Sequence, residues 1–205
     1  MIMDFKEKMK NGYLYRCYDD VIGEELVNKL AKCKELLYDF NHTRPSELAK
    51  RDEIIRKVFA SVGENCYIEP PLNANWGCNT YVGKNFYSNF NLTLVDDADI
   101  IIGDYVMIAP NVVIATGTHP INPGLRQENY QFNLPVKIGN RVWIGAGSII
   151  LPGVTIGDDS VIGAGSVVTK DIPSGVVAYG NPCVVRREIS EKDKIYYYKD
   201  RKIEE

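Results

Sequence analysis

Aliphatic residues return every six positions through most of the chain from residue 62 onward. Five segments open alike, with Val-Gly or Ile-Gly, at Val62, Val82, Ile102, Ile138 and Ile156. A spacing of six fits neither the 3.6-residue period of an amphipathic helix nor the two-residue alternation of a sheet strand. It predicts a triangular solenoid whose interior is filled by stacked aliphatic side chains.

The fourth place of the hexad is rich in residues that take left-handed backbone conformations at low cost. The corners predicted in this way are Asn65, Asn85, Asn91, Asp97, Asn111, Gly117, Gly147, Gly153, Asp159 and Gly165. Three hexads close one coil, and each coil buries its core only against its neighbours. We therefore expect an all-β solenoid, a parallel β-helix of about five coils. An ordinary β-sandwich would space its strands less regularly.

Residues 1–61 lack the hexad and predict an N-terminal α-helical cap. Apolar residues between Leu26 and Phe40 recur at helical spacing, which indicates an amphipathic helix. Residues 41–45 break it, and we expect Pro45 to stand in the first turn of a second helix. This second helix is expected to bury Leu48, Ile55, Val58 and Phe59. Two such helices cannot form a stable domain alone, so they are expected to cover the first coil.

The hexad disappears over residues 120–135 and then resumes, which predicts an excursion loop from the β-helix of residues 62–187. The charged, tyrosine-rich tail 188–205 is expected to be a short surface helix or a frayed end. His119 stands where coil meets loop, so its backbone is held while its ring can face outward. Histidine ordinarily titrates near neutral pH and suits a general base that takes a hydroxyl proton. His42, the other histidine, lies in the helix-breaking turn and is expected to be structural.

Composition narrows the partners of this 205-residue chain. It is 45% hydrophobic and 25% charged, with a net charge of −3, so it has no basic surface for nucleic acid. No apolar run is long enough to span a membrane, and no signal peptide is visible, which indicates a cytoplasmic protein. The five cysteines are scattered without a Cys-x-x-Cys pair, so we expect reduced thiols rather than disulfides.

Several segments resemble the maltose and galactoside O-acetyltransferases, which are hexapeptide-repeat acyltransferases. They are NFYSNFNL at 85–92, VDD at 95–97, IAPN at 108–111, VWIG at 142–145 and VIGAGSVVTKDIP at 161–173, with NHTRPSE at 41–47 in the cap. The resemblance extends to about Arg187. It implies left-handed coils, a homotrimer with active sites at subunit boundaries, acetyl-CoA as co-substrate and no metal. It also implies acetyl transfer to a sugar hydroxyl.

By this resemblance His119 matches the catalytic histidine, while Asn89 and Asp97 match positions that hold sugar hydroxyls. Asn75 and Cys17 stand at acceptor-site positions where relatives carry other residues, and Trp76 is a candidate wall of that pocket. The backbone N–H of Ala146 matches an oxyanion donor. Positions along the coenzyme groove are matched by Ala164, Thr169, Lys170 and Arg187. Val184 replaces a common coenzyme-contacting arginine.

Other functions of a hexapeptide solenoid remain open at this stage. A zinc enzyme of the γ-carbonic anhydrase type needs three histidines at each site, and the solenoid has only His119. Serine or amino-sugar acetyltransferases lack this helical cap beside the Asn-Phe-x-x-Asn-Phe segment. An antibiotic-modifying O-acetyltransferase would share the histidine and the coenzyme groove, so the acceptor itself is undetermined.

Overall fold

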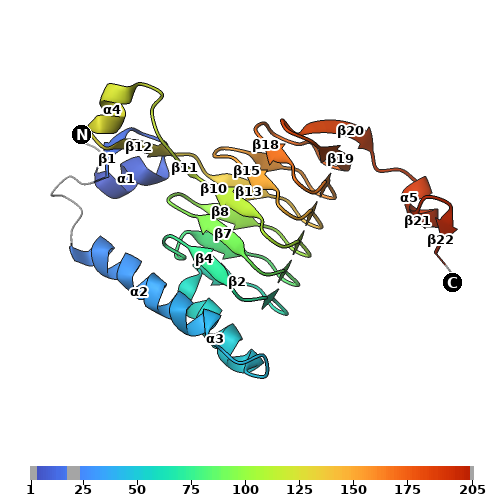
Figure 1. Ribbon diagram of the computed structural model, residues 1–205, viewed down its shortest axis with the longest axis horizontal. Coiled ribbons are helices and arrows are strands. Elements are labelled where there is room, and N and C mark those ends of the chain that lie inside the picture. Colours follow the sequence, from blue (N-terminus) through green and yellow to red (C-terminus); the bar gives the residue numbers. More distant parts are fainter. Residues whose placement is uncertain (1–3, 18–23, 204–205) are drawn as a thin grey trace.

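The computed structural model describes residues 4–17 and 24–203, in which three parallel sheets form the sides of a triangular column (Figure 1). The chain passes over the first, second and third faces in turn, then begins the next coil. The first face consists of β2 (Ser61–Val62), β5 (Thr80–Val82), β8 (Ile100–Ile102), β13 (Val136–Ile138) and β16 (Thr155–Ile156). The second consists of β3 (Tyr67–Ile68), β6 (Tyr87–Ser88), β9 (Met107–Ile108), β14 (Trp143–Ile144), β17 (Val161–Ile162) and β19 (Val176–Tyr179). The third consists of β4 (Leu72–Ala74), β7 (Leu92–Val95), β10 (Val113–Ala115), β15 (Ile149–Ile150) and β18 (Val167–Val168).

The predicted solenoid is confirmed, with about six turns rather than five. The additional turn is the last one, made by a single bridge between Ile156 and Ile172 and by β19. Its sequence, Asp171-Ile172-Pro173-Ser174-Gly175, lacks the Ile-Gly opening. The repeat pattern alone therefore missed it.

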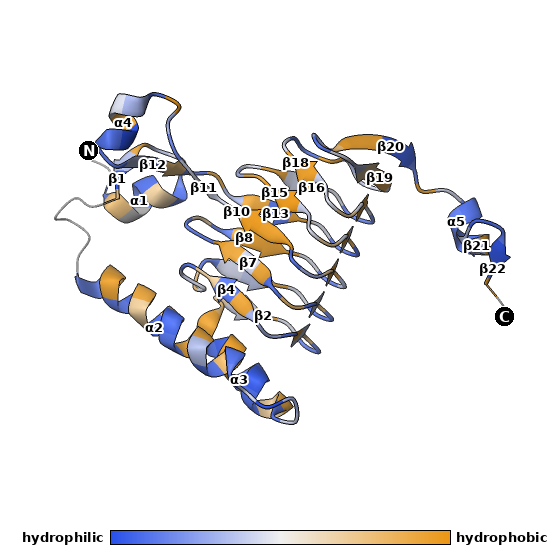
Figure 2. Cartoon of the chain, viewed as in Figure 1, coloured by the Kyte–Doolittle hydropathy of each residue, from blue (hydrophilic) through white to orange (hydrophobic). Residues whose placement is uncertain are grey.

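The hexad-first residues stack inward, each above its equivalent in the next coil. On the first face Val82, Ile102, Ile138 and Ile156 pair in register and are at most 4% exposed. These strands form an apolar band through the column in Figure 2. Burial of branched aliphatic side chains on every coil contributes about 1.5–3 kcal/mol per side chain, so the stack supplies most of the driving force for folding.

Eight of the ten predicted corners have the expected positive φ, from 55° at Asn65 to 83° at Gly153. Asp97 and Gly117 do not. Tyr105 and Arg141 also take positive φ, of 57° and 55°. Their side chains do not favour this conformation, so residue type did not mark them as corners.

The helical cap is formed by α2 (Glu24–Asn41) and α3 (Leu48–Val58), which cover the first coil (Figure 1). Asn41 fixes this contact, since its side chain donates to the Leu72 carbonyl at 2.9 Å and accepts from the Leu72 amide at 2.8 Å. Two details of the prediction are wrong. Pro45 lies in the turn before α3 rather than inside it, and Leu48 is 53% exposed because it begins the helix on its outer side.

Residues 4–17 pack against the excursion loop. They form α1 (Phe5–Lys10) and β1 (Tyr15–Arg16). The excursion folds as β11 (Gly117–Thr118), α4 (Pro123–Gln127) and β12 (Tyr130–Asn133). β12 pairs antiparallel with β11 and with β1, so a small three-stranded sheet stands beside the column. Hydrophobic spacing could not reveal a pairing between segments more than 100 residues apart.

The C-terminal segment leaves the end of the column remote from the cap. β20 (Val184–Glu188) pairs antiparallel with β19 and is followed by α5 (Lys192–Ile195). A hairpin of β21 (Tyr196–Tyr198) and β22 (Arg201–Lys202) completes it, and the segment extends outward rather than lying on the column (Figure 1). Within 4–17 and 24–203, no helix is long and apolar enough to cross a bilayer.

Candidate active site

His119 follows β11 directly, and its exposed ring is oriented by the backbone of β12. Its Nδ1 atom lies 3.0 Å from the Tyr130 carbonyl oxygen. A carbonyl oxygen can only accept, so Nδ1 carries the hydrogen in the neutral ring and Nε2 holds a free lone pair. The arrangement gives His119 the tautomer that a general base requires.

The three-stranded sheet also brings the side chains of Gln131 and Cys17 together. β11 and β12 pair Gly117 with Asn133 and Thr118 with Phe132, so one more step sets His119 opposite Gln131. Cys17, just beyond β1, donates its thiol to Gln131 Oε1 at 3.0 Å. Burial, with the charge of Asp97, raises the pKa of this thiol, which therefore stays protonated as the donor.

Asp97 is the acidic group of this cluster. Its Oδ1 accepts from Trp76 Nε1 at 2.8 Å and from Asn75 Nδ2 at 3.2 Å, and its Oδ2 accepts from Gln131 Nε2 at 3.3 Å. A carboxylate offers about four lone-pair directions, so Oδ2 keeps capacity for one more donor. A side chain at Gly117 would collide with Oδ2 and displace the carboxylate, so glycine leaves Asp97 in this position. The Asp97 carboxylate is therefore held in place by three donors and can still accept a hydrogen bond from a ligand.

Asp96 stabilises the same cluster from the interior, a function that the sequence did not reveal. Its Oδ1 accepts from the backbone amides of Asn75 and Trp76 at 3.0 and 2.8 Å, and its Oδ2 from Thr80 Oγ1 at 3.2 Å. The side chain is fully buried, and this burial raises its pKa to about 6 despite those hydrogen bonds. Asp96 therefore fixes the turn that carries Asn75 and Trp76.

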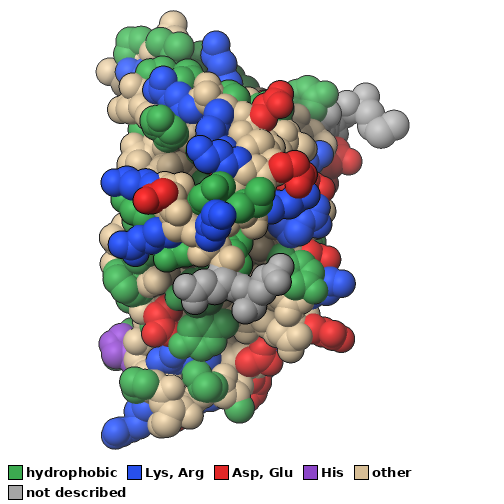
Figure 3. Space-filling view, turned by 90° about the vertical axis from the view of Figure 1, so that its right-hand side faces the viewer, with side chains coloured by type: hydrophobic (Ala, Val, Ile, Leu, Met, Phe, Trp, Pro, Cys, Tyr) green, Lys and Arg blue, Asp and Glu red, His purple; other side chains and the backbone are tan. Residues whose placement is uncertain are grey.

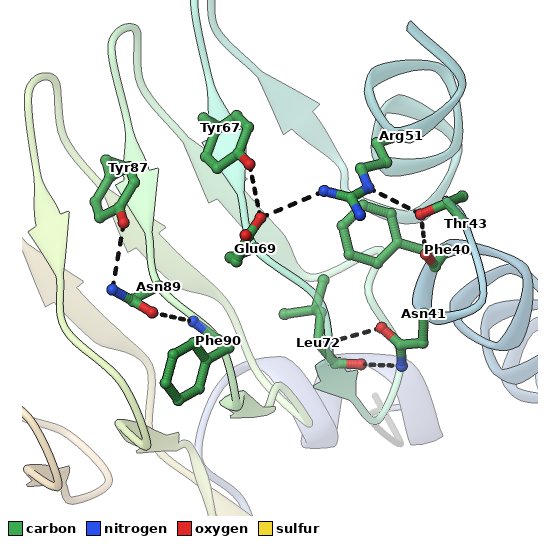
Figure 4. Close-up of polar contacts among 10 residues, drawn as sticks. All are labelled: Phe40, Asn41, Thr43, Arg51, Tyr67, Glu69, Leu72, Tyr87, Asn89 and Phe90. Carbon is green, nitrogen blue, oxygen red and sulfur yellow. Dashed lines mark hydrogen bonds and ion pairs between the residues drawn. The ribbon is translucent and has the colours of Figure 1, made fainter. Parts of the chain in front are cut away.

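Asn89 lies at the other end of β7 from Asp97. Its Oδ1 accepts from the Phe90 amide at 2.8 Å, and its Nδ2 donates to the Tyr87 hydroxyl at 3.3 Å (Figure 4). The Tyr87 ring stacks on Tyr67, with centroids 6.0 Å apart. Asn89 can therefore offer a ligand its second Nδ2 hydrogen and the remaining lone pair of Oδ1.

The family models and the relatives agree on one assignment. Residues 8–63 match the maltose acetyltransferase hexapeptide capping motif, and residues 135–170 match the bacterial transferase hexapeptide family. The chain is 51% identical over 204 residues to galactoside O-acetyltransferase of Escherichia coli (strain K12), covering 100% of this chain and 98% of the relative. The chain belongs to the galactoside and maltose O-acetyltransferase family.

Solved structures give the same result. A galactoside acetyltransferase in complex with coenzyme A matches with a TM-score of 0.94 at 50% identity, covering 100% of both chains. A maltose O-acetyltransferase from Clostridium difficile 630 matches with a TM-score of 0.88 at 49% identity, covering 92% of this chain and 99% of that one. The family predicted from the motifs is thus confirmed.

In this acetyltransferase the candidate residues divide between two edges of the third face. Asn89, Ala146 and Ala164 precede β7, β15 and β18, at the upstream edge. The downstream edge, where the chain leaves the third face, carries Asp97, His119, Thr169 and Lys170. The four residues of β7 alone span about 13 Å. A single copy therefore does not bring Asn89 to His119.

The coenzyme candidates of this acetyltransferase differ in how free they are to bind. Ala146 is exposed, and its amide donates no hydrogen bond within the described residues, as an oxyanion donor requires. Lys170 is exposed and forms no ion pair with any residue that the structure describes. Arg187, in contrast, contacts both carboxylate oxygens of Asp193 at 2.8 Å. On the face of the molecule that carries the C-terminal segment, acidic side chains lie among the lysines and arginines (Figure 3).

Proposed function

We propose that this chain transfers an acetyl group from acetyl-CoA to a hydroxyl of a sugar, with His119 as general base. The observation that carries the proposal is the Nδ1 contact of His119 with the Tyr130 carbonyl, which leaves the lone pair of Nε2 free to take a proton. The names of the relatives support the substrates, since they include galactoside and maltose O-acetyltransferases and a complex with coenzyme A. We also propose a cytoplasmic location, in keeping with five free cysteines.

The reaction needs no enzyme nucleophile. Nε2 of His119 takes the proton of the sugar hydroxyl while the oxygen attacks the thioester carbon. The oxyanion of the tetrahedral intermediate accepts a hydrogen bond from the Ala146 amide. Collapse of the intermediate breaks the carbon–sulfur bond, and the imidazolium returns its proton to the leaving thiolate. The products are the acetylated sugar and coenzyme A.

We propose that the enzyme is a homotrimer whose active sites lie between subunits. The division of candidate residues over two edges supports this. If the upstream edge of one copy faces the downstream edge of the next, Asn89 and Ala146 approach the neighbouring His119. A contact between two different surfaces closes into a ring when its rotation allows. In this arrangement Asp97, Asn75 and Cys17 bind the sugar from one subunit and Asn89 binds it from the other.

On the coenzyme side, Ala164 and Thr169 are proposed to line the groove for the pantetheine chain. Lys170 is proposed to neutralise a phosphate group. Arg187 can do the same only after it exchanges Asp193 for a phosphate.

Thiol release from acetyl-CoA tests the proposed function. Maltose, glucose, a galactoside, serine and chloramphenicol are compared as acceptors at equal concentration. We expect coenzyme A to appear in proportion to an acetylated sugar. Release with only serine or only chloramphenicol would assign the chain to another acceptor class, and release with none of the five would refute the proposal.

A further inference from the structure

A cavity of about 280 Å³ adjoins Asp97 on the side of the helices α1 and α2. These helices contribute Met9, Lys10, Leu26 and Lys29, and the turn after β4 contributes Trp76, Cys78 and Asn79. Asp97 is therefore a wall of this cavity and also a neighbour of Gly117 and Gln131 in the candidate active site. Of the candidate acceptor-site residues, Asp97 and Trp76 line this cavity.

We propose that this cavity is a second acceptor subsite that takes the non-reacting sugar ring of a disaccharide or glycoside. The inference rests on the proposed sugar acetyltransferase function. The volume lies just below the range of roughly 300–1,000 Å³ typical of sites for larger small molecules. It suits one ring beyond the ring bound at Asp97, and no longer oligosaccharide.

Trp76 gives the cavity a rigid apolar wall. Its ring nitrogen donates to Asp97 and its backbone amide to Asp96, both at 2.8 Å. Gly77 has a φ of 66°, and a Cβ there would lie 2.6 Å from Val58 Cγ1, so the turn packs directly on α3. An indole face held in this way can pack against the C–H face of a sugar ring without losing side-chain freedom on binding.

The polar groups around the cavity favour a neutral ligand. Lys29 pairs with Glu25 at 2.9 Å, and the other charged lining residues are one cation, Lys10, and one anion, Asp97. Asn79 donates its Nδ2 to the Asp96 carbonyl at 2.8 Å, which leaves its Oδ1 to accept from a hydroxyl. Sugars provide both the hydroxyls and the apolar ring face that this combination requires.

The test compares maltose with methyl glucoside, which lacks the second ring. For the unaltered enzyme we expect kcat/KM to be roughly five to ten times higher for maltose, the range typical of one aromatic contact. Leu26→Trp, which fills the cavity from α2, should remove this preference. It should leave the values for methyl glucoside and the KM for acetyl-CoA unchanged.

Leu30→Trp is the matched control, one turn further along α2 and outside the cavity, and it should keep the preference. Cys78→Phe fills the cavity from the opposite wall at an exposed position, should Leu26→Trp fail to fold. Equal kcat/KM for both sugars in the unaltered enzyme would overturn the subsite while leaving the proposed function intact. An equal loss for both sugars in the filled variants would also overturn it. Absence of transfer to either sugar would refute the proposed function as well.

Discussion

The Nδ1 atom of His119 lies 3.0 Å from the carbonyl oxygen of Tyr130, across the antiparallel pair of β11 and β12. The contact joins a residue at the root of the excursion loop to one near its end. It sets the tautomer and the direction of the imidazole together. The excursion therefore positions the base, and β1 supports the excursion from its other side.

Asp97→Asn is expected to raise the KM for the acceptor sugar about 10- to 100-fold, because a hydrogen bond to a charged group is lost. The amide should retain the contact with Trp76 through its oxygen. The KM for acetyl-CoA should stay the same, and initial rates at varied sugar and coenzyme concentrations separate the two. A parallel rise in both values would show that Asp97 only stabilises the fold.

Mixed oligomers test the shared site. Neither His119→Ala nor Asn89→Ala should be active alone, but each variant retains what the other lacks. After coexpression in equal amounts, about one site in four should combine an intact His119 with an intact Asn89 from the neighbouring copy. Activity should recover to about that fraction. No recovery in purified mixed oligomers would place both residues in one subunit's site.

The pairing of Arg187 with Asp193 leads to a prediction about the coenzyme. Hydrogen bonds from Arg187 and Ser190 hold the pKa of Asp193 below its ordinary range, so this carboxyl is ionised and competes with phosphate. Asp193→Asn is expected to lower the KM for acetyl-CoA severalfold at low ionic strength, an effect that shrinks with added salt. Glu191→Gln, which removes a charge from the same tail, serves as the control. Identical changes in both variants would contradict a specific competition.

Asp96 predicts a pH dependence of stability. Its pKa is raised from 3.8 to about 6 in the folded protein, so the folded state binds this proton more tightly than the unfolded chain. The resulting stabilisation is complete below about pH 3.8 and is lost as the pH rises through about 6. Between these values it changes by about 1.4 kcal/mol per pH unit.

Urea unfolding of the unaltered enzyme and of Asp96→Asn measures this pH-dependent contribution of Asp96 to the free energy of unfolding. From about pH 5 to about pH 7.5 the unaltered protein should lose about 1.4 kcal/mol of unfolding free energy relative to the variant. Asparagine keeps an oxygen for the amides of Asn75 and Trp76 but does not titrate. The same change with pH in both proteins would show that another group is responsible.

The sequence predicted the parts of the fold that repeat locally. The stacking of Ile102 on Ile138 follows from the hexad spacing. The corner at Asn85 follows from its residue type, because asparagine takes a positive φ at low cost. The last turn was not predicted, because Ile172 is not followed by glycine as in the other coils. The handedness and the trimer came only from the family resemblance, since a repeat of six permits either hand.

The sequence yields candidate site residues but not the geometry that relates them. His119 stood out at the break of the repeat, yet its partner Tyr130 lies in β12, within the excursion, where no repeat marks a strand. Gln131 contacts Cys17, 114 residues away, through a pairing that no local pattern encodes. The sequence also could not show which of the two adjacent carboxylates, Asp96 or Asp97, is buried in the interior. The pairing of Arg187 with Asp193 could not be predicted, because Asp193 lies in the tail, which has no repeat.

The most direct measurement is the acetylation rate of His119→Ala with maltose, together with its affinity for coenzyme A measured by calorimetry. Loss of the general base should lower kcat by about 10²- to 10⁴-fold, while coenzyme A binds as tightly as before. A variant that acetylates maltose at the unaltered rate would contradict the assignment of His119 as the base.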